Sequence, residues 1–326
     1  MKLITTDDII DIYYRLSLKG LGFLGSKLTF NPMARTYSSF NSDEMLTCNW
    51  WNIPAVRNRW NEKISGDSKL SYADYVFNKY LKDSQSLKLL SPGCGVCTNE
   101  FRFAAYPSFS EITCVDLAEK PLLTARKSAI EKNFLQMKII KADVNKMNFP
   151  KEFYDLVMFN SSLHHFENVE NLLINTISDT MKPDGLLLIN EYVGPNRLQW
   201  SKKQLHLVND LLQTRIPVKY RRRYKSRLIK NHISGPGVLR MVFSDPSEAV
   251  DSESIVPALR KGFTPLEETN LGGNILMILL KDIAHHFTGD DPQAMLILDD
   301  LMKIEDDFLY TEGYNNIFGI YRKNKK

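Results

Sequence analysis

The sequence predicts an α/β fold: a seven-stranded, mostly parallel sheet with helices on both faces, extended by an N-terminal helical cap and a helical insertion. Three observations support this prediction. Short apolar segments alternate with helical segments, which is typical of βαβ units with right-handed crossovers. The first apolar segment ends in a glycine-rich turn, and the next four end in Asp, Asn or Glu. Because parallel strands end at one edge of their sheet, these polar groups should meet there, where such sheets bind ligands.

Residues 1–82 are expected to form the N-terminal cap, or lid. Apolar side chains recur at helical spacing over residues 8–18 and again over 71–81, which predicts a helix in each segment. Residues 20–40 are rich in Gly, Asn and Ser, which predicts a linker. Residues 48–60 hold three of the four tryptophans beside two arginines. This composition suits a wall for a cofactor or a sugar, and equally a lid helix packed by its own tryptophans.

The glycine-rich turn follows the first predicted strand. Residues 87–90 are mostly apolar, and residues 92–95 read Pro-Gly-Cys-Gly. A helix is expected next, with Thr98 or Asn99 as its cap. Glycines allow a sharp turn and close approach of a ligand to the backbone, and a helix start favours anionic groups. The pattern predicts a site for a nucleotide-like cofactor.

Four further strands are predicted from short apolar runs that end in polar residues. They cover residues 111–116, ending in Asp116; 137–143, ending in Asp143; 154–160, ending in Asn160; and 186–191, ending in Glu191. Asp116 lies 21 positions after Gly95, close to the spacing of roughly 20 residues at which an acidic side chain binds ribose hydroxyls.

The rest of the chain completes the sheet. A mostly helical insertion is expected at about 196–260, then a strand over 263–269. Helices are predicted over 275–286 and 292–310, and a last strand over 316–322.

Taken as a set, these motifs resemble the class I S-adenosylmethionine-dependent methyltransferases over about residues 85–195. The set comprises Gly93-Cys94-Gly95, Asp116, Ala142-Asp143, Leu163-His164-His165-Phe166 and Met181-Lys182-Pro183-Asp184-Gly185. The resemblance implies a Rossmann-like fold, a methyltransferase domain over residues 83–326, and S-adenosyl-L-methionine as cofactor. Two residues depart from the family pattern: Ser91 stands where Asp or Glu is usual, and Cys97 stands where a third glycine is common.

The resemblance and the strand ends together give candidate site residues. The expected cofactor-binding residues are Ser91, Gly93, Cys94, Gly95, Asp116, Leu117, Asp143, Val144, Asn160 and Arg59. The expected catalytic residues are His165, Glu191 and Tyr192, with His165 or Glu191 as the base, since an imidazole titrates near neutral pH. The expected substrate-binding residues are Trp50, Trp51, His164, Arg197, Gln199 and Trp200.

The methyl acceptor is expected to be a glycan or a small polar molecule. The Asn/Asp-Pro-Pro-Tyr signature of related amine methylases is missing, because Ser161-Ser162 follows Asn160, and this favours an oxygen acceptor. A second, less specific resemblance, to a bacterial methyltransferase group associated with glycan and surface-polysaccharide assembly, covers most of the chain. RNA is the alternative, because residues 215–230 carry eight Lys and Arg with two interleaved tyrosines. A non-catalytic cofactor-binding module and a dehydrogenase-type nucleotide binder also remain open.

Composition adds few constraints. The chain has 326 residues and a net charge of +4, too small to decide its partners. We expect no membrane span and no signal peptide, hence a cytoplasmic protein, and the sequence leaves the oligomeric state open. The pair Cys94 and Cys97 has redox spacing, but five β-α units are more than a thioredoxin-like fold needs, and zinc would need two more suitably spaced ligands. Adjacent histidines rarely share one ion, so no metal is predicted.

Overall fold

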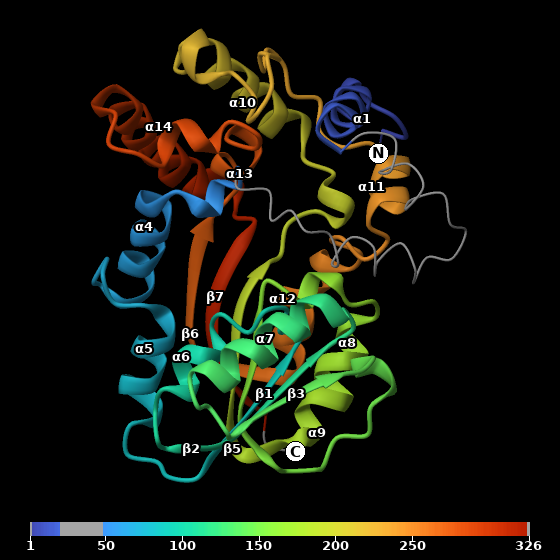
Figure 1. Cartoon of the computed structure of the whole chain (residues 1–326), viewed down its shortest axis with the longest axis vertical. Helices are drawn as coiled ribbons and strands as arrows, with labels where there is room; N and C mark the ends of the chain where they lie inside the picture. The colour runs from blue at the N-terminus through green and yellow to red at the C-terminus, as the bar shows by residue number, and fades with distance from the viewer. Residues whose placement is uncertain (1, 20–47, 325–326) are drawn as a thin grey trace. The chain divides into compact units, whose positions relative to one another are not determined.

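The computed structural model describes residues 2–19 and 48–324 (Figure 1). Its centre is one seven-stranded sheet with strand order β3-β2-β1-β4-β5-β7-β6. The strands are β1 Leu87–Pro92, β2 Phe109–Asp116, β3 Met137–Lys141, β4 Tyr154–Asn160, β5 Met181–Tyr192, β6 Phe263–Gly272 and β7 Asn316–Lys323. The predicted seven-stranded α/β fold is confirmed, and each predicted strand is present.

Strands β1 to β5 are paired in parallel, which aligns their carboxyl ends. Ser91 of β1 pairs with Cys114 of β2, and Asn160 of β4 pairs with Asn190 of β5. Residues 156–159 of β4 are fully buried, as expected for a strand covered on both faces. The chain therefore returns repeatedly to one edge of the sheet with polar residues.

Helices fill the connections. They are α1 Thr6–Lys19, α4 Pro54–Ser65, α5 Tyr72–Val76, α6 Glu100–Ala104, α7 Glu119–Glu131, α8 Val169–Asn171, α9 Ser178–Thr180, α10 Lys202–Thr214, α11 Val238–Ser244, α12 Ile255–Gly262, α13 Leu276–Leu279 and α14 Pro292–Glu312. The helices predicted over 8–18, 71–81 and 292–310 are confirmed, the second continuing from α5 as a π-helical turn over Phe77–Leu81. The predicted linker over 20–40 lies outside the described residues. Within the described ranges, no helix combines the length and apolar character that crossing a membrane requires.

Two helical predictions are wrong in extent. The apolar run 275–286 holds only the four residues of α13 and a 3-10 turn over Ala284–Phe287, because uniform burial gives apolar character without helical periodicity. The helix predicted after the glycine turn is confirmed as α6, with Asn99 at its N-cap position; it has five residues, so its macrodipole is small.

The insertion is the second case, because residues 215–237 are largely irregular. Its basic run is not a solvated helix face. Arg221, Arg223 and Lys230 are buried, and Arg223 pairs with Asp282. Buried cations need fixed partners, and these contacts, not a helix, set the backbone here.

The chain divides into two compact units. The first unit comprises Met1–Trp60, Gly194–Glu248 and Asn270–Asn316; the second comprises Asn61–Val193, Ala249–Thr269 and Ile317–Lys326. These units cut the chain at other positions than the predicted cap (1–82), methyltransferase domain (83–326) and insertion (about 196–260). That division into domains stays a prediction.

Candidate active site

The glycine loop, residues 92–97, is fixed on two sides within the second unit. The amide of Gly93 donates to the Val115 carbonyl at the end of β2, at 2.7 Å. A Cβ at Gly93, where φ is +71°, would lie 2.7 Å from the Cβ of Ser162, so glycine is required there. A Cβ at Gly95 would meet nothing within 4 Å. The loop is therefore packed below and beside Gly93 and open at Gly95, which fits a cofactor that lies against the backbone.

Asp116 ties the loop to β2. Its Oδ2 accepts a hydrogen bond from the Gly95 amide and its Oδ1 one from the Ala118 amide, both at 2.8 Å. Each carboxylate oxygen has a second lone pair, so the same group can also accept from ribose hydroxyls. Leu117 is half-buried beside it.

The end of β3 carries the next predicted pair. Asp143 caps the 3-10 turn Val144–Lys146 by accepting from the Asn145 amide at 3.0 Å, and it pairs with Lys146 at 3.2 Å. Val144 is buried. Both residues therefore have a local structural role at the sheet edge where cofactor binding is expected.

Ser91 has an unpredicted partner. Its Oγ donates to Oε1 of Glu100 at 2.5 Å, and both side chains are buried. Burial, followed by the nearby Cys97, raises the pKa of the Glu100 carboxyl to about 8. A carboxyl group thus stands next to Ser91, the position where the family that the sequence resembles usually has Asp or Glu, but it is largely protonated at neutral pH.

The cysteines of the loop lie close to a third thiol. Hydrogen bonds from the thiols of Cys114 and Cys94 lower the pKa of Cys97 to about 5. Cys97 is fully buried and adopts a left-handed backbone with φ of 59°. The residue at the usual third glycine thus keeps the glycine-like conformation of the loop.

Asn160 ends β4 inside a polar network. Its side-chain oxygen accepts from the Tyr72 hydroxyl and from the amide nitrogen of Asn190, each at 2.8 Å. Tyr72 comes from α5, so this network joins the segment before β1 to the carboxyl ends of β4 and β5.

His164 and Glu191 form a buried dyad. The Nδ1 of His164 lies 2.7 Å from Oε2 of Glu191. The other oxygen, Oε1, accepts from the amides of Ser162 and Leu163 at 2.6 and 2.8 Å. The carboxylate is 1% exposed and the imidazole residue 8% exposed. Glu191 therefore fixes both the turn Leu163–His165 and the orientation of His164.

The dyad and the glycine loop are joined by Ser162. Its amide binds Glu191, and its Oγ donates to the Pro92 carbonyl at 2.9 Å. His165 is half-buried, with its ring 4.2 Å from that of His164, and Tyr192 is buried with its ring 6.2 Å from His164. The second unit thus brings together the three predicted catalytic residues, His164 and the loop.

Arg59, predicted to bind the cofactor, belongs to the first unit. Its guanidinium donates to Glu305 at 2.8 Å and to Asp306 at 2.6 Å. Glu305 is fully buried and also accepts from the amides of Ile275 and Leu276, at the start of α13. The structure therefore gives Arg59 a structural ion pair, and its role toward a cofactor stays a prediction.

The tryptophans of the predicted lid pack on each other. The rings of Trp50 and Trp51 are each in contact with that of Trp60, at centroid distances of 5.5 and 3.9 Å. Trp50 and Trp60 are buried, while Trp51 is partly exposed. Trp50 also lies against Gly273. Packing is the observed role of Trp50.

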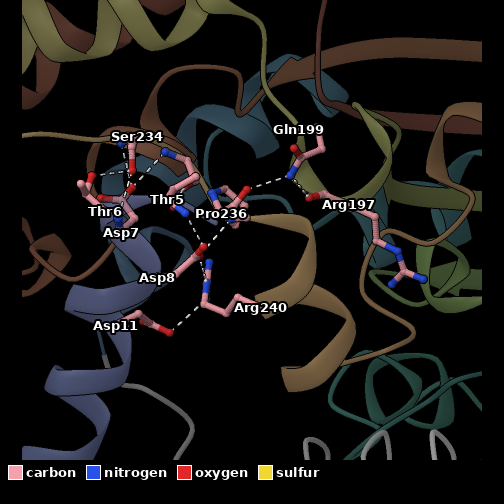
Figure 2. Close-up of polar contacts among 12 residues, drawn as sticks. Thr5, Thr6, Asp7, Asp8, Asp11, Arg197, Gln199, Ser234, Pro236 and Arg240 are labelled. Atoms are coloured by element: carbon pink, nitrogen blue, oxygen red, sulfur yellow. Dashed lines mark hydrogen bonds and ion pairs between the residues drawn. The ribbon is translucent and has the colours of Figure 1, made fainter. Parts of the chain in front are cut away.

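Arg197 and Gln199 bind backbone carbonyls within the first unit. Figure 2 shows Gln199 directed at Pro236 and at the backbone of Arg197, with distances of 2.8 and 3.1 Å. Arg197 donates to the Pro246 and Glu248 carbonyls at 2.5 and 3.2 Å. The indole nitrogen of Trp200 is buried with no hydrogen-bond partner in the described part of the chain.

Residues 234–240 of the insertion bind the N-terminal helix α1. Figure 2 also shows Asp8 and Asp11 at Arg240, with Asp8 at 2.7 Å and Asp11 at 3.0 Å. Asp7 accepts from the Ser234 and Gly235 amides. Helix α1 is therefore fastened to the insertion.

Comparison with known proteins assigns part of the second unit, residues 90–189, to a family of domains. A family model described as a methyltransferase domain matches residues 90–189, which include the glycine loop, Asp116, Asp143 and His164. This segment is a methyltransferase domain. Its cofactor is S-adenosylmethionine, which fits the open glycine loop and the carboxylate of Asp116.

A curated relative matches about a third of the chain. The chain is 25% identical over 114 residues to the ubiquinone/menaquinone biosynthesis C-methyltransferase UbiE of Stutzerimonas stutzeri (strain A1501). The alignment covers 35% of this chain and 44% of that protein, so the chain spans less than half of this relative's length.

Solved structures include two similar methyltransferases. One is phosphoethanolamine N-methyltransferase 2 of Haemonchus contortus in complex with S-adenosylmethionine (16% identity, 78% of this chain and 53% of that chain, TM-score 0.47). The other is an S-adenosylmethionine-dependent methyltransferase from Mesorhizobium loti (17% identity, 77% and 97% coverage, TM-score 0.44). At these identities and TM-scores they carry no argument about the acceptor.

Sequence reasoning missed Glu100 and Ser162. Glu100 lies nine positions after Ser91, on the helix that follows the loop. Because Ser91 replaces the usual Asp or Glu, a glutamate so close in sequence was a usable signal of a substitute carboxyl group. Ser162 acts through its amide and a backbone acceptor, and no side-chain pattern announces such contacts.

Proposed function

We propose that the whole chain is an S-adenosylmethionine-dependent methyltransferase that methylates a hydroxyl oxygen of a glycan or another small polar molecule. The observation that supports this best is the His164–Glu191 dyad, at 2.7 Å, joined through Ser162 to the glycine loop. A base held by a carboxylate beside a cofactor loop suits an acceptor that must lose a proton.

The cofactor supplies an electrophilic methyl group when it is bound. Gly93, Gly95, Asp116 and Asp143 are the residues that would hold it. They act by alignment, since holding reactants in attack geometry can contribute roughly 7–11 kcal/mol.

His164 is the proposed general base. Because the carboxylate of Glu191 accepts at Nδ1, that nitrogen carries the hydrogen and Nε2 is the nitrogen that takes the proton from the acceptor. Both oxygens of Glu191 are engaged, so in this proposal Glu191, one of the two candidate bases from the sequence, is a positioning residue. His165 and Tyr192, which lie beside His164, are proposed to contact the acceptor.

For the acceptor we retain a glycan or a small polar molecule over RNA. Trp51 is partly exposed, and an exposed aromatic face suits a sugar or a polar ring. Arg221 and Arg223, which lie inside the basic run, are buried, and this reduces what that run can offer to phosphates. Cytoplasmic residence, expected from the sequence, is kept as part of the proposal.

The test is transfer of tritiated methyl groups from S-adenosylmethionine into separate pools of glycans, small molecules and RNA. Label in a glycan or small molecule supports the proposal, and NMR of the product identifies the methylated atom. Label confined to RNA would overturn the acceptor, and cofactor binding without any labelled product would favour a non-catalytic module.

The base is tested on the labelled product. His164→Ala should lower kcat at least about a hundredfold with little change in S-adenosylhomocysteine affinity. The matched control is His165→Ala, which should act mainly on KM. A larger kcat loss in His165→Ala than in His164→Ala would return the role of base to His165.

A further inference from the structure

Three of the chain's four cysteines converge under the glycine loop. Cys94 and Cys97 lie in the loop, and Cys114 lies on β2, paired in register with Ser91 of β1. Their Sγ atoms all lie within 4.8 Å of one another. Cys97 and Cys114 are fully buried and Cys94 is half-buried.

We propose that this thiol triad, Cys94, Cys97 and Cys114, binds one thiophilic metal ion of the Zn²⁺ type and thereby fastens the glycine loop to β2. Thiolates are the ligands that zinc and other soft cations prefer. Spacing along the chain predicted no metal because only two cysteines are close in sequence; strand pairing supplies the third.

The distances allow coordination with small movements. A Zn–S bond of about 2.3 Å places tetrahedral sulfurs about 3.8 Å apart. The triad therefore has to contract by at most about 1 Å, which rotation of unbranched side chains can provide. Three protein ligands leave a fourth position for water or another small ligand, and half-buried Cys94 gives the ion a path of entry.

The backbone at Cys97 is consistent with a ligand role. Its φ of 59° is left-handed, a conformation that side chains with a Cβ rarely adopt. This conformation keeps the thiol fully buried against the other two. Strain of this kind is characteristically retained at functional positions.

The experiment is a metal titration of the reduced, metal-free full chain. Zn²⁺ should bind at one equivalent, and Co²⁺ should give the thiolate-to-cobalt charge-transfer band. Cys114→Ser should weaken Zn²⁺ binding by about a hundredfold or more. Cys48→Ser is the matched control, because Cys48 is a buried thiol of the first unit in contact with His285; it should bind like the unaltered chain.

A second readout guards against a variant that only misfolds. Zn²⁺ should raise Tm in the unaltered chain and in Cys48→Ser but not in Cys114→Ser, since only binding to the folded state stabilises it. Equal Zn²⁺ affinity in both variants would overturn the proposal. So would failure of the unaltered chain to bind while mild peroxide converts two of the three thiols to a disulfide, which would mark a redox pair instead. None of these readouts depends on methyl transfer.

Discussion

Asp116 shows how one carboxylate can serve both structure and binding. Its two oxygens hold the amides of Gly95 and Ala118, which fixes the loop and orients the remaining lone pairs. A side chain fixed before the ligand arrives loses little entropy on binding.

Asp116→Ala should weaken S-adenosylhomocysteine binding at least tenfold, about 1.4 kcal/mol, because the loop loses an acceptor for Gly95 and the cofactor loses a hydroxyl acceptor. Isothermal calorimetry measures this. Asp184→Ala, an exposed aspartate of the same unit, is the control and should bind normally. Unchanged affinity in a folded Asp116→Ala would remove the cofactor from this loop.

Lys230 is a buried cation in the first unit. Its ammonium donates to the carbonyls of Ile278, Leu279 and Lys281 at 2.8 to 3.1 Å, at the end of α13. Burial lowers its pKa to about 7 despite the nearby carboxylates Asp282 and Asp7, and the cations Arg223 and Lys281 lower it further.

This shift predicts a pH dependence of stability. Between about pH 7 and 10.5 the unfolded chain binds more protons than the folded chain, so the Lys230 contribution makes stability rise with pH, by at most about 1.4 kcal/mol per unit. Lys230→Met should flatten that rise in denaturant unfolding, whereas Lys202→Met, at an exposed lysine, should not. A slope identical in all three proteins would contradict the shift.

At the scale of elements, the glycine loop and the loop after β4 act as one body. The hydroxyl of Ser162 donates a hydrogen bond to the Pro92 carbonyl, and its amide donates one to the Glu191 carboxylate. The side chain of Ser162 also packs directly against Gly93. The glycine loop and the His164–Glu191 dyad are therefore both positioned by contacts of the same residue, Ser162.

Gly93→Ala should lower cofactor affinity and Tm, because the new Cβ would lie 2.7 Å from that of Ser162 at a φ of +71°. The backbone cost alone is measured by Gly66→Ala, where φ is +76° and nothing lies within 4 Å. The added Ser162→Gly change should restore part of the affinity, and a Gly93→Ala protein no worse than Gly66→Ala would refute the contact.

At the scale of the whole molecule, the net charge of +4 does not show which Lys and Arg side chains are buried and which are exposed. Within the basic run, three cations are buried, Arg221, Arg223 and Lys230, whereas five are exposed: Arg215, Lys219, Arg222, Lys225 and Arg227. Only exposed cations can release counterions from a polynucleotide.

The triple change Arg222→Glu, Lys225→Glu and Arg227→Glu should therefore leave methyl transfer to a glycan or small molecule within about twofold, since it alters only the long-range field. Steady-state kinetics at low and moderate salt measures this. Loss of turnover together with a steep salt dependence in the unaltered chain would point to RNA.

The sequence by itself determined the succession of segments along the chain: five apolar runs, the turn at Gly93, and the polar residues at the strand ends. The apolar pattern and the turn-forming residues are local properties of the sequence, so the strand over residues 154–160 was predicted with the observed bounds. The same logic located Gly93, Gly95, Asp116 and Asn160 at one sheet edge, because parallel strands share it.

Only the tertiary structure decided what those side chains contact. Glu191 was a candidate base by position, but two backbone amides and His164 occupy it. Arg59 pairs with acids almost 250 positions away, and Cys114 reaches Cys94 and Cys97 through strand pairing. Such partners belong to segments far apart in sequence, which burial and sheet register bring into contact. Neither burial nor register can be derived from the local spacing of residues.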